Sequence, residues 1–328
     1  MLSVVDWLLP GPPYVQYRAR LDLLGQREDE PQVVAAREAM LAQPEVQALV
    51  AGLADWPGRE LTRHNDAGHP LHKLAFLADL GLRQEDPGMG LVVERALAGQ
   101  SPEGAFELSI NVPVHFGGSG TGESAWMLCD APTVLYALAT LGLADDPRVE
   151  RAAAHLAGLA RENGWPCAVA SRLGGFRGPG RKGDPCPYAT LVATKALAAL
   201  PRWRESEPVR IGAEALLSLW QGRRERRPYM FAMGSGFAKL KAPLIWYDAL
   251  HLFDVLSRLP WLRDDPRLAE LAGLAAAKAD DQGRFTPESV WQAWGDWEFG
   301  QKKRPSEWVT FLVRRAFAAL AEHGEPET

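Results

Sequence analysis

Cysteine is scarce in this chain, with three residues among 328. An odd number of thiols does not form a paired disulfide framework, so a reducing compartment is indicated, and we expect a cytoplasmic protein. Long hydrophobic runs are also missing, which argues against a membrane-spanning helix. The first ten residues lack a basic stretch, and Asp6 interrupts their short apolar run, so no secretory signal peptide is expected.

The chain also lacks an excess of positive charge. Lysine and arginine total 36 against 41 aspartate and glutamate residues, which gives a net charge of -5 and an isoelectric point near 5.9. This balance argues against nucleic acid or an anionic membrane as the bulk partner. Hydrophobic residues make up 47% of the chain and charged residues 23%, values typical of a folded globular protein.

Strand-like alternation is nearly absent and occurs only in short pieces near 106–115 and 229–233. Instead, five segments are apolar on almost every side and predict helices buried all round. These segments are 69–81, 130–142, 187–200, 247–259 and 306–317. Amphipathic segments opened by a proline lie between them, at 147–161, 208–223 and 266–280.

This alternation predicts an all-α fold in which inner helices surround a central cavity and outer helices wrap them. We therefore expect an α/α toroid of about five to six helical hairpins. The whole chain, 1–328, is interpreted as a single domain, with a helical extension over 1–30 and the hairpins over 31–328.

Two short sequence patterns recur at the ends and at the starts of the predicted outer helices. A polar pair, a glycine and an aromatic residue recur at 100–106, 161–165 and 281–285, as in a helical-hairpin array. Asp-Asp-Pro-Arg occurs at 145–148 and 264–267, each time at the start of an outer helix. We interpret these acidic pairs as helix caps rather than metal ligands.

A basic loop rich in glycine and proline, residues 174–188, carries the strongest chemical signal. It ends in Asp184-Pro185-Cys186, a carboxylate and a thiol at the start of a predicted inner helix. Both side chains are of types that bind zinc. His251 lies in a later inner helix, one hairpin further along the chain.

The glycine–aromatic turns resemble the repeats of the squalene cyclase and prenyltransferase superfamily, over about residues 60–320. The loop resembles the zinc-site segment of protein prenyltransferase β-subunits. The residues that match its pattern are Gly174, Gly175, Phe176, Gly178, Lys182, Asp184 and Cys186. This copy is one residue shorter before the aspartate and has Pro187 before the tyrosine. His251 is followed by Leu-Ser-Arg-Leu at 256–259, where the family has Leu-Ser-Gly-Leu.

The resemblance implies an α/α toroid that transfers or cyclises an isoprenoid or another apolar substrate bearing a diphosphate. The Asp-x-Asp-Asp acid motif of squalene-type cyclases is absent, which argues against cyclisation started by protonation. Protein prenyltransferases work with a helical partner subunit, and the sequence identifies neither such a partner nor a protein acceptor. The implied site residues are the zinc ligands Asp184, Cys186 and His251 and the diphosphate-binding Arg177, Arg181 and Lys182.

Zinc held by one carboxylate, one thiolate and one imidazole keeps a fourth position for a substrate thiolate or water. Cys167 is an alternative ligand, which would give a softer Cys-Cys-His site similar to that of the lanthionine cyclases, also toroids. The other interpretation of the loop is a solvated turn in which Cys186 is only a small buried hydrophobic residue.

Further candidates lie at the starts of inner helices. Asp248, one turn before His251, is a candidate to orient that imidazole or to act as an acid or base. Asp130 and His72 are the other catalytic candidates, and Tyr188 and Trp246 are candidates to bind an apolar substrate. Helix capping and packing between helix layers are the structural alternatives for these residues.

A loop holding His64, Asp66 and His69 precedes His72, and Cys129 precedes Asp130. The histidine-rich loop suits either a second metal site or substrate contact, and cap and loop hydrogen bonds are the structural alternative. Cys129 is placed where it could face the cavity.

Three hypotheses about function follow. The first is a prenyltransferase-like or terpene cyclase-like enzyme, with zinc as cofactor. The second is a carbohydrate-active (α/α)-barrel hydrolase or lyase, for which Glu123, Asp130 and Asp248 are the candidate carboxylates. The third is a toroid that binds a lipid or a peptide without catalysis.

Overall fold

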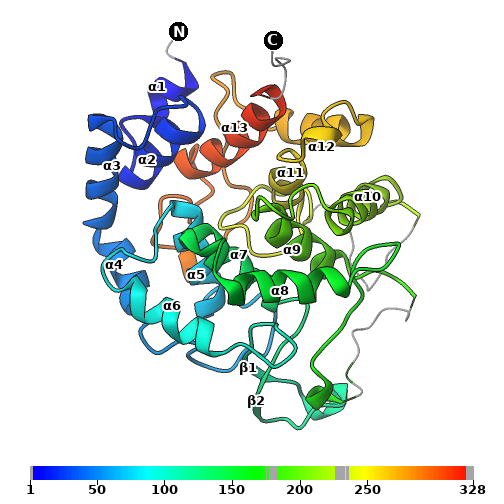
Figure 1. Ribbon diagram of the computed structural model, residues 1–328. Helices are drawn as coiled ribbons and strands as arrows, with labels where there is room; N and C mark the ends of the chain where they lie inside the picture. Colours follow the sequence, from blue (N-terminus) through cyan, green and yellow to red (C-terminus); the bar gives the residue numbers. More distant parts are fainter. Residues whose placement is uncertain (1–2, 175, 177–182, 226–232, 234–235, 323–328) are drawn as a thin grey trace. The chain divides into compact units, whose positions relative to one another are not determined.

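The structure, a computed structural model, describes residues 3–174, 176, 183–225, 233 and 236–322. This part of the chain is mostly helical and has one small sheet (Figure 1). The chain divides into two compact units. Unit 1 comprises Met1–Ala48 and Gly234–Thr328, and unit 2 comprises Leu49–Met233. No described helix is both long and apolar enough to cross a membrane.

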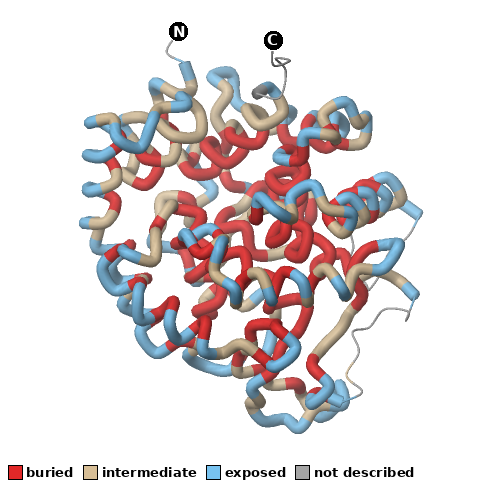
Figure 2. Tube along the Cα trace, in the orientation of Figure 1, coloured by how far each residue is buried: buried red, intermediate tan, exposed pale blue. Residues whose placement is uncertain are grey.

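Unit 2 contains three helices that are buried around nearly their whole circumference. They are α5 (Pro70–Leu80), α7 (Ala131–Leu138) and α9 (Pro187–Ala198). Helix α7 packs against both α5 and α9, so the three lie side by side, and Figure 2 shows their burial. Almost no part of these helices faces water, which agrees with the prediction from their apolar residues on almost every side.

Three amphipathic helices of unit 2 bury one face each. They are α6 (Met89–Ala98), α8 (Pro147–Gly158) and α10 (Glu207–Gln221). Helix α8 contacts α7 and α9, and α10 packs on α9. Gly212 permits the close approach of α10, because a Cβ atom there would collide with the Thr194 hydroxyl of α9. Unit 2 thus combines fully buried and amphipathic helices, as the sequence pattern predicts.

Between α6 and α7 the chain forms a small antiparallel sheet of β1 (Leu108–Asn111) and β2 (Gly122–Ala125). Strand β1 lies within the predicted piece 106–115. The other predicted piece, 229–233, lies outside the described residues except for Met233. Shorter helical turns complete the unit and are η1 (Val114–Phe116), the π-helical η2 (Ala139–Leu143) and η3 (Ser171–Leu173).

In unit 1, α13 packs against both α2 and α11, while α3 packs on α2 and α12 on α11. Helix α11 is buried along its whole length. The α-helices of this unit are α1 (Val4–Leu8), α2 (Pro13–Asp22), α3 (Pro31–Leu41), α11 (Ala249–Leu256), α12 (Pro266–Ala276) and α13 (Glu307–Glu322). Helix α4 (Pro44–Ala51) crosses the boundary between the units, and η5 (Pro260–Leu262) and η6 (Gln292–Trp294) are short turns.

The glycine–aromatic turn makes the same hydrogen bonds in both units. Trp165 is fully buried, and its amide donates to the Thr190 hydroxyl at 3.1 Å. Phe285 is 2% exposed, and its amide donates to the Thr310 hydroxyl at 2.9 Å. In each copy, therefore, a threonine of the following buried helix fixes the aromatic residue.

The same turns hold the start of that buried helix. The Trp165 carbonyl accepts the Cys186 amide at 2.7 Å, and the Phe285 carbonyl accepts the Ser306 amide at 2.9 Å. The Ser306 hydroxyl accepts the amide of Val309 at 3.1 Å, as an N-cap does. Cys186 and Ser306 therefore occupy equivalent positions in two copies of one structural element.

The acidic pairs before the outer helices act as caps, which confirms that prediction. The Asp146 carboxylate accepts the Arg148 amide at 2.7 Å, at the start of α8. The Asp265 carboxylate accepts the Arg267 amide at 2.8 Å, at the start of α12. Each aspartate thus satisfies an amide that has no partner within its helix.

Candidate functional site

Helices α5, α7 and α9 begin close to one another within unit 2. The contacts that bring their starts together run from His72 to the His64 carbonyl, from His64 to Asp130, and from Cys129 to Cys186. Each helix N-terminus carries a partial positive charge. This end of the unit therefore favours anionic groups.

Cys186 is the N-cap of α9 and is 3% exposed. Its sulfur accepts the amide of Ala189 at 3.5 Å and a hydrogen bond from the thiol of Cys129. This hydrogen bond lowers the pKa of Cys186, although burial acts to raise it. The same hydrogen bond and burial both raise the pKa of Cys129. Cys186 is thus the sulfur that carries negative charge more readily.

His64 and Asp130 form an ion pair beside this sulfur. The Nδ1 of His64 donates to both carboxylate oxygens of Asp130, at 3.0 and 2.9 Å. Burial acts to lower the pKa of His64, but the Asp130 carboxylate and then Cys186 outweigh it, so the pKa is raised. Asp130 is fully buried, while the His64 side chain retains 29% of its exposure.

The third cysteine lies near the same place. The amide of Leu128 donates to the carbonyl of Ala168 at 3.0 Å, so the segments that precede Cys129 and follow Cys167 lie side by side. Cys129 and Cys167 also interact electrostatically. Cys167 is partly exposed, and all three cysteines are free thiols.

Two other histidines support the loop that carries His64. His72 donates from Nε2 to the carbonyl of His64 at 2.8 Å, and burial lowers its pKa to about 4. The Nδ1 of His69 accepts the amide of Leu71, its Nε2 donates to the carbonyl of Arg59, and burial lowers its pKa. Both imidazoles are held neutral. These contacts correspond to the cap and loop hydrogen bonds that the sequence offered as the structural alternative.

The remaining described candidates of unit 2 are Asp184, Tyr188 and Glu123. Asp184 is half-buried, two residues before Cys186. Tyr188 is 1% exposed and hydrogen-bonds Thr133, and burial raises its pKa. Glu123 lies on β2 and is half-buried. Of the predicted diphosphate-binding residues, Arg177, Arg181 and Lys182 all lie outside the described residues.

The candidates of unit 1 lie at the start of α11. The Asp248 carboxylate caps the helix by accepting the His251 amide at 3.0 Å, and Lys241 lies 3.7 Å from it. Burial raises the pKa of Asp248 to about 6. The Nδ1 of His251 donates to the carbonyl of Trp246 at 3.0 Å, and the Trp246 side chain is half-buried.

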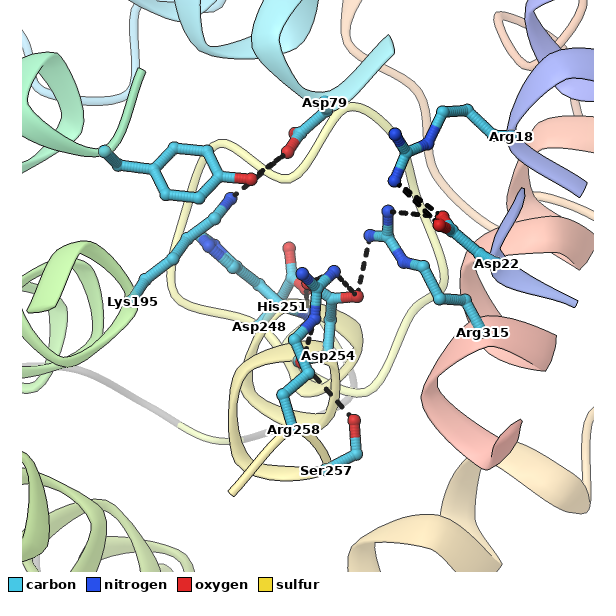
Figure 3. A network of polar contacts seen from close by, with 11 residues as sticks. Arg18, Asp22, Asp79, Lys195, Asp248, His251, Asp254, Ser257, Arg258 and Arg315 are labelled. Atoms are coloured by element: carbon cyan, nitrogen blue, oxygen red, sulfur yellow. Dashed lines mark hydrogen bonds and ion pairs between the residues drawn. The ribbon is translucent and has the colours of Figure 1, made fainter. Parts of the chain in front are cut away.

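A chain of ion pairs links α11, α13 and α2 in unit 1 (Figure 3). Asp254 of α11 accepts from Arg258 and from Arg315 of α13, both at 2.8 Å. Arg315 lies 3.9 Å from Asp22 of α2, which pairs with Arg18 at 2.7 Å. Because Asp254 is 1% exposed, these arginines compensate a buried charge.

Unit 2 has its own buried polar cluster between the fully buried helices. The Nζ of Lys195 lies 3.9 Å from the Asp79 carboxylate, which accepts a hydrogen bond from the Tyr136 hydroxyl at 2.5 Å. This cluster was not predicted from the sequence. A charged residue inside an otherwise apolar helix, as at Asp79 and Lys195, is the signal that would have found it.

The zinc ligands implied by the resemblance lie in both units, Asp184 and Cys186 in unit 2 and His251 in unit 1. That set stays a prediction. Among the described side chains, no group of three or more His, Cys, Asp or Glu residues is arranged to hold a metal ion as it stands. The structure does bring Cys129, Cys186, His64 and Asp130 together, a combination that the sequence analysis did not propose.

No protein-family model matches the chain, and no curated protein matches it. Among solved structures, a protein from Actinoplanes is similar at 17% sequence identity, over 95% of this chain and 90% of that one, with a TM-score of 0.42.

Proposed function

We propose that this chain is a prenyltransferase-like enzyme that binds an isoprenoid or another apolar substrate and carries out its chemistry beside the sulfur of Cys186. The observation that carries the proposal is the placement of this thiol. Cys186 caps a fully buried helix where the equivalent position has Ser306, and it lies beside Cys129 and the His64–Asp130 pair. A reactive sulfur needs neighbours of this kind, which favour its thiolate form.

We further propose that the helical hairpins of 1–328 close into an α/α toroid. The side-by-side packing of α5, α7 and α9, and the amphipathic α8 and α10 that pack on them, support this architecture within unit 2. The repeated glycine–aromatic turn supports it along the chain, because the same hydrogen bonds recur around Trp165 and Phe285. A toroid would supply an apolar cavity for an isoprenoid chain. Free thiols are consistent with a cytoplasmic location.

Each candidate residue has a proposed role in this reaction. An acceptor thiol or water attacks the isoprenoid carbon as diphosphate leaves, and His64, oriented by Asp130, accepts the proton that the nucleophile loses. The Cys186 thiolate lies beside this step. Zinc, when bound at Cys186, would lower the pKa of a bound thiol or water at neutral pH. The roles that remain predictions are diphosphate binding by Arg177, Arg181 and Lys182, apolar contact by Tyr188 and Trp246, and acid–base chemistry by His72 and Asp248.

The test uses the full chain with geranyl, farnesyl and geranylgeranyl diphosphate, each with and without a cysteine peptide as acceptor. Release of diphosphate and the mass of the organic product are measured. We expect turnover in the wild type and in Cys167→Ser, and none in Cys186→Ser. Undiminished turnover in Cys186→Ser would refute the placement of the reaction beside this sulfur. Binding of isoprenoid without turnover would favour the lipid-binding hypothesis instead.

A further inference from the structure

We infer that Cys129 and Cys167 form a reversible disulfide when the protein is exposed to hydrogen peroxide, so that this pair is an oxidative modification site of unit 2. The inference goes beyond the function proposed above, because it needs neither an isoprenoid nor a metal. It rests on the backbone pairing of two segments, 126–128 and 168–170.

Two backbone hydrogen bonds hold these segments antiparallel. The Leu128 amide donates to the Ala168 carbonyl at 3.0 Å, and the Ala170 amide donates to the Trp126 carbonyl at 2.9 Å. Bonds placed in this way enclose a non-hydrogen-bonded residue pair, whose side chains lie close together on one face. The register of the two segments is therefore fixed.

The enclosed pair is Met127 and Val169, which form an isolated antiparallel bridge. Two residues further, in opposite directions along the two segments, the same register reaches Cys129 and Cys167. Positions two apart in an antiparallel pairing are of the same kind, and their Cα atoms are about 4.5 Å apart in an ideal sheet. A disulfide joins Cα atoms about 4.4–6.8 Å apart, so this register suits one.

The chain turns where the pairing reaches Cys129. The Asp130 amide donates to the Met127 carbonyl at 3.0 Å, and Cys129 lies within this turn. The turn takes Cys129 off the ideal strand path, and the range of Cα separations that disulfides tolerate accommodates the departure. In the reduced protein Cys129 and Cys167 already interact electrostatically, which agrees with their opposed positions.

The two thiols differ in their access to solvent. Cys167 is half-buried, whereas Cys129 is 7% exposed. Peroxide therefore reaches Cys167 first, and its sulfur attacks the O–O bond to give a sulfenic acid and one water. The sulfur of Cys129 then attacks the sulfur of Cys167. The S–S bond forms as the hydroxyl group leaves with the Cys129 proton as a second water. Two molecules of glutathione reduce the bond again and become glutathione disulfide.

The third thiol, Cys186, has a different position. It is 3% exposed, and its sulfur caps α9 by accepting the Ala189 amide at 3.5 Å. A disulfide at Cys186 would turn the sulfur away from this amide. Cys129 and Cys167 lie outside the helices, so a bond between them leaves the helix caps in place. Cys186 is therefore expected to stay reduced.

The bond would close a loop of the chain that contains α7 and α8. It would tie the start of a buried helix to the segment that follows an amphipathic one. Such a link stabilises a fold mainly because it restricts the unfolded chain. The oxidised protein should therefore unfold at a higher urea concentration than the reduced protein. Disulfides of cytosolic proteins are usually transient or redox-sensing, and this one fits that use.

The experiment counts the thiols of the full chain in denaturant, after complete reduction and then treatment with hydrogen peroxide. We expect the count to fall from the three cysteines of the chain to one, and glutathione to restore it. Cys129→Ser and Cys167→Ser should lose the ability to form the bond. Cys186→Ser is the matched control and should still form it, with no thiol left after oxidation.

Peptide mapping identifies which sulfurs are joined. Trypsin places the three cysteines on separate peptides, because it cleaves after Arg161 and after Lys182. The cross-linked species should contain the peptides of Cys129 and Cys167. Circular dichroism of each reduced variant separates loss of the bond from loss of the fold.

Four results would overturn the inference. They are three thiols that survive peroxide in the wild type, a cross-link that includes Cys186, a disulfide that forms only between two chains, and an oxidised protein that unfolds at lower urea concentration than the reduced one. The last result would show that the native backbone opposes the bond. Isoprenoid turnover enters none of these measurements, so the inference and the proposed function stand or fall separately.

Discussion

Replacement of His72 by glutamine should change how the stability of the protein depends on pH. His72 is 2% exposed and donates to the carbonyl of His64, so it holds the loop that carries His64. Burial lowers its pKa from the ordinary 6.5 to about 4. The folded protein therefore keeps this imidazole neutral at a pH where the unfolded chain protonates it.

The sign and the size follow from these two values. Above pH 6.5 both states leave His72 neutral, and its contribution to the free energy of unfolding is complete. As the pH falls from 6.5 to about 4, the unfolded chain gains a proton that the folded protein does not, so stability is lost. A difference of 2.5 pKa units (6.5 − 4) corresponds to about 3 kcal/mol, of which about 2 kcal/mol lies between pH 7 and 5.

The assay is urea unfolding at several pH values for the wild type and for His72→Gln. Glutamine does not titrate, and its amide can still donate to the His64 carbonyl. The difference between the two proteins isolates one residue, because other titrating groups contribute equally to both. Hydrogen exchange of residues 70–80 reports on unit 2 alone. If the two stability curves run parallel from pH 7 to 4, the reasoning about burial of His72 is wrong.

Three further substitutions test the packing of the two units. Burial raises the pKa of Asp248 to about 6, so the pH dependence of stability from this residue is opposite to that from His72. The stability that Asp248 contributes below pH 3.8 is lost as the pH rises to 6, by about 3 kcal/mol. Urea titrations of Asp248→Asn should not show this loss. Asp254→Ala leaves the buried Arg315 without its main carboxylate and should cost about 3–5 kcal/mol in denaturant unfolding; an unchanged midpoint would contradict this. Gly212→Ala should cost about 1–3 kcal/mol, since the added methyl group collides with Thr194; a thermal midpoint at or above that of the wild type would refute this packing argument.

The buried helices could be predicted because their segments are apolar on almost every side. Apolar residues occupy every side of segments 69–81, 130–142 and 187–200, and these segments contain α5, α7 and α9. The starts of the helices could also be predicted, because proline and aspartate mark the first turns. The predicted helix over 130–142 is α-helical only to Leu138 and continues as the π-helical η2, a local change that hydrophobic periodicity does not reveal.

The candidate site was only partly predictable. Its residue types stand out in the sequence, but the pairing of His64 with Asp130 depends on α7 packing against α5. The pairing of Cys129 with Cys186 depends in the same way on α7 packing against α9. Periodicity shows that these helices are buried, and it does not show which helix starts are neighbours. The sequence therefore identified these residues without identifying the centre that they form.

Cys186→Ser separates a chemical role of this thiol from a structural one. In chelator-treated protein, the serine hydroxyl should cap α9 as Ser306 caps the start of α13, and the free energy of unfolding should stay within about 1 kcal/mol of the wild type. If Cys186 were only a small hydrophobic residue, burial of a hydroxyl in its place would cost about 1–3 kcal/mol and metal content would not change. A stable variant that has lost zinc and turnover is the result expected here. A destabilised variant that keeps both would assign Cys186 to the core. The first result is expected because a hydroxyl group suffices at the equivalent position, so a thiol at Cys186 needs a chemical reason.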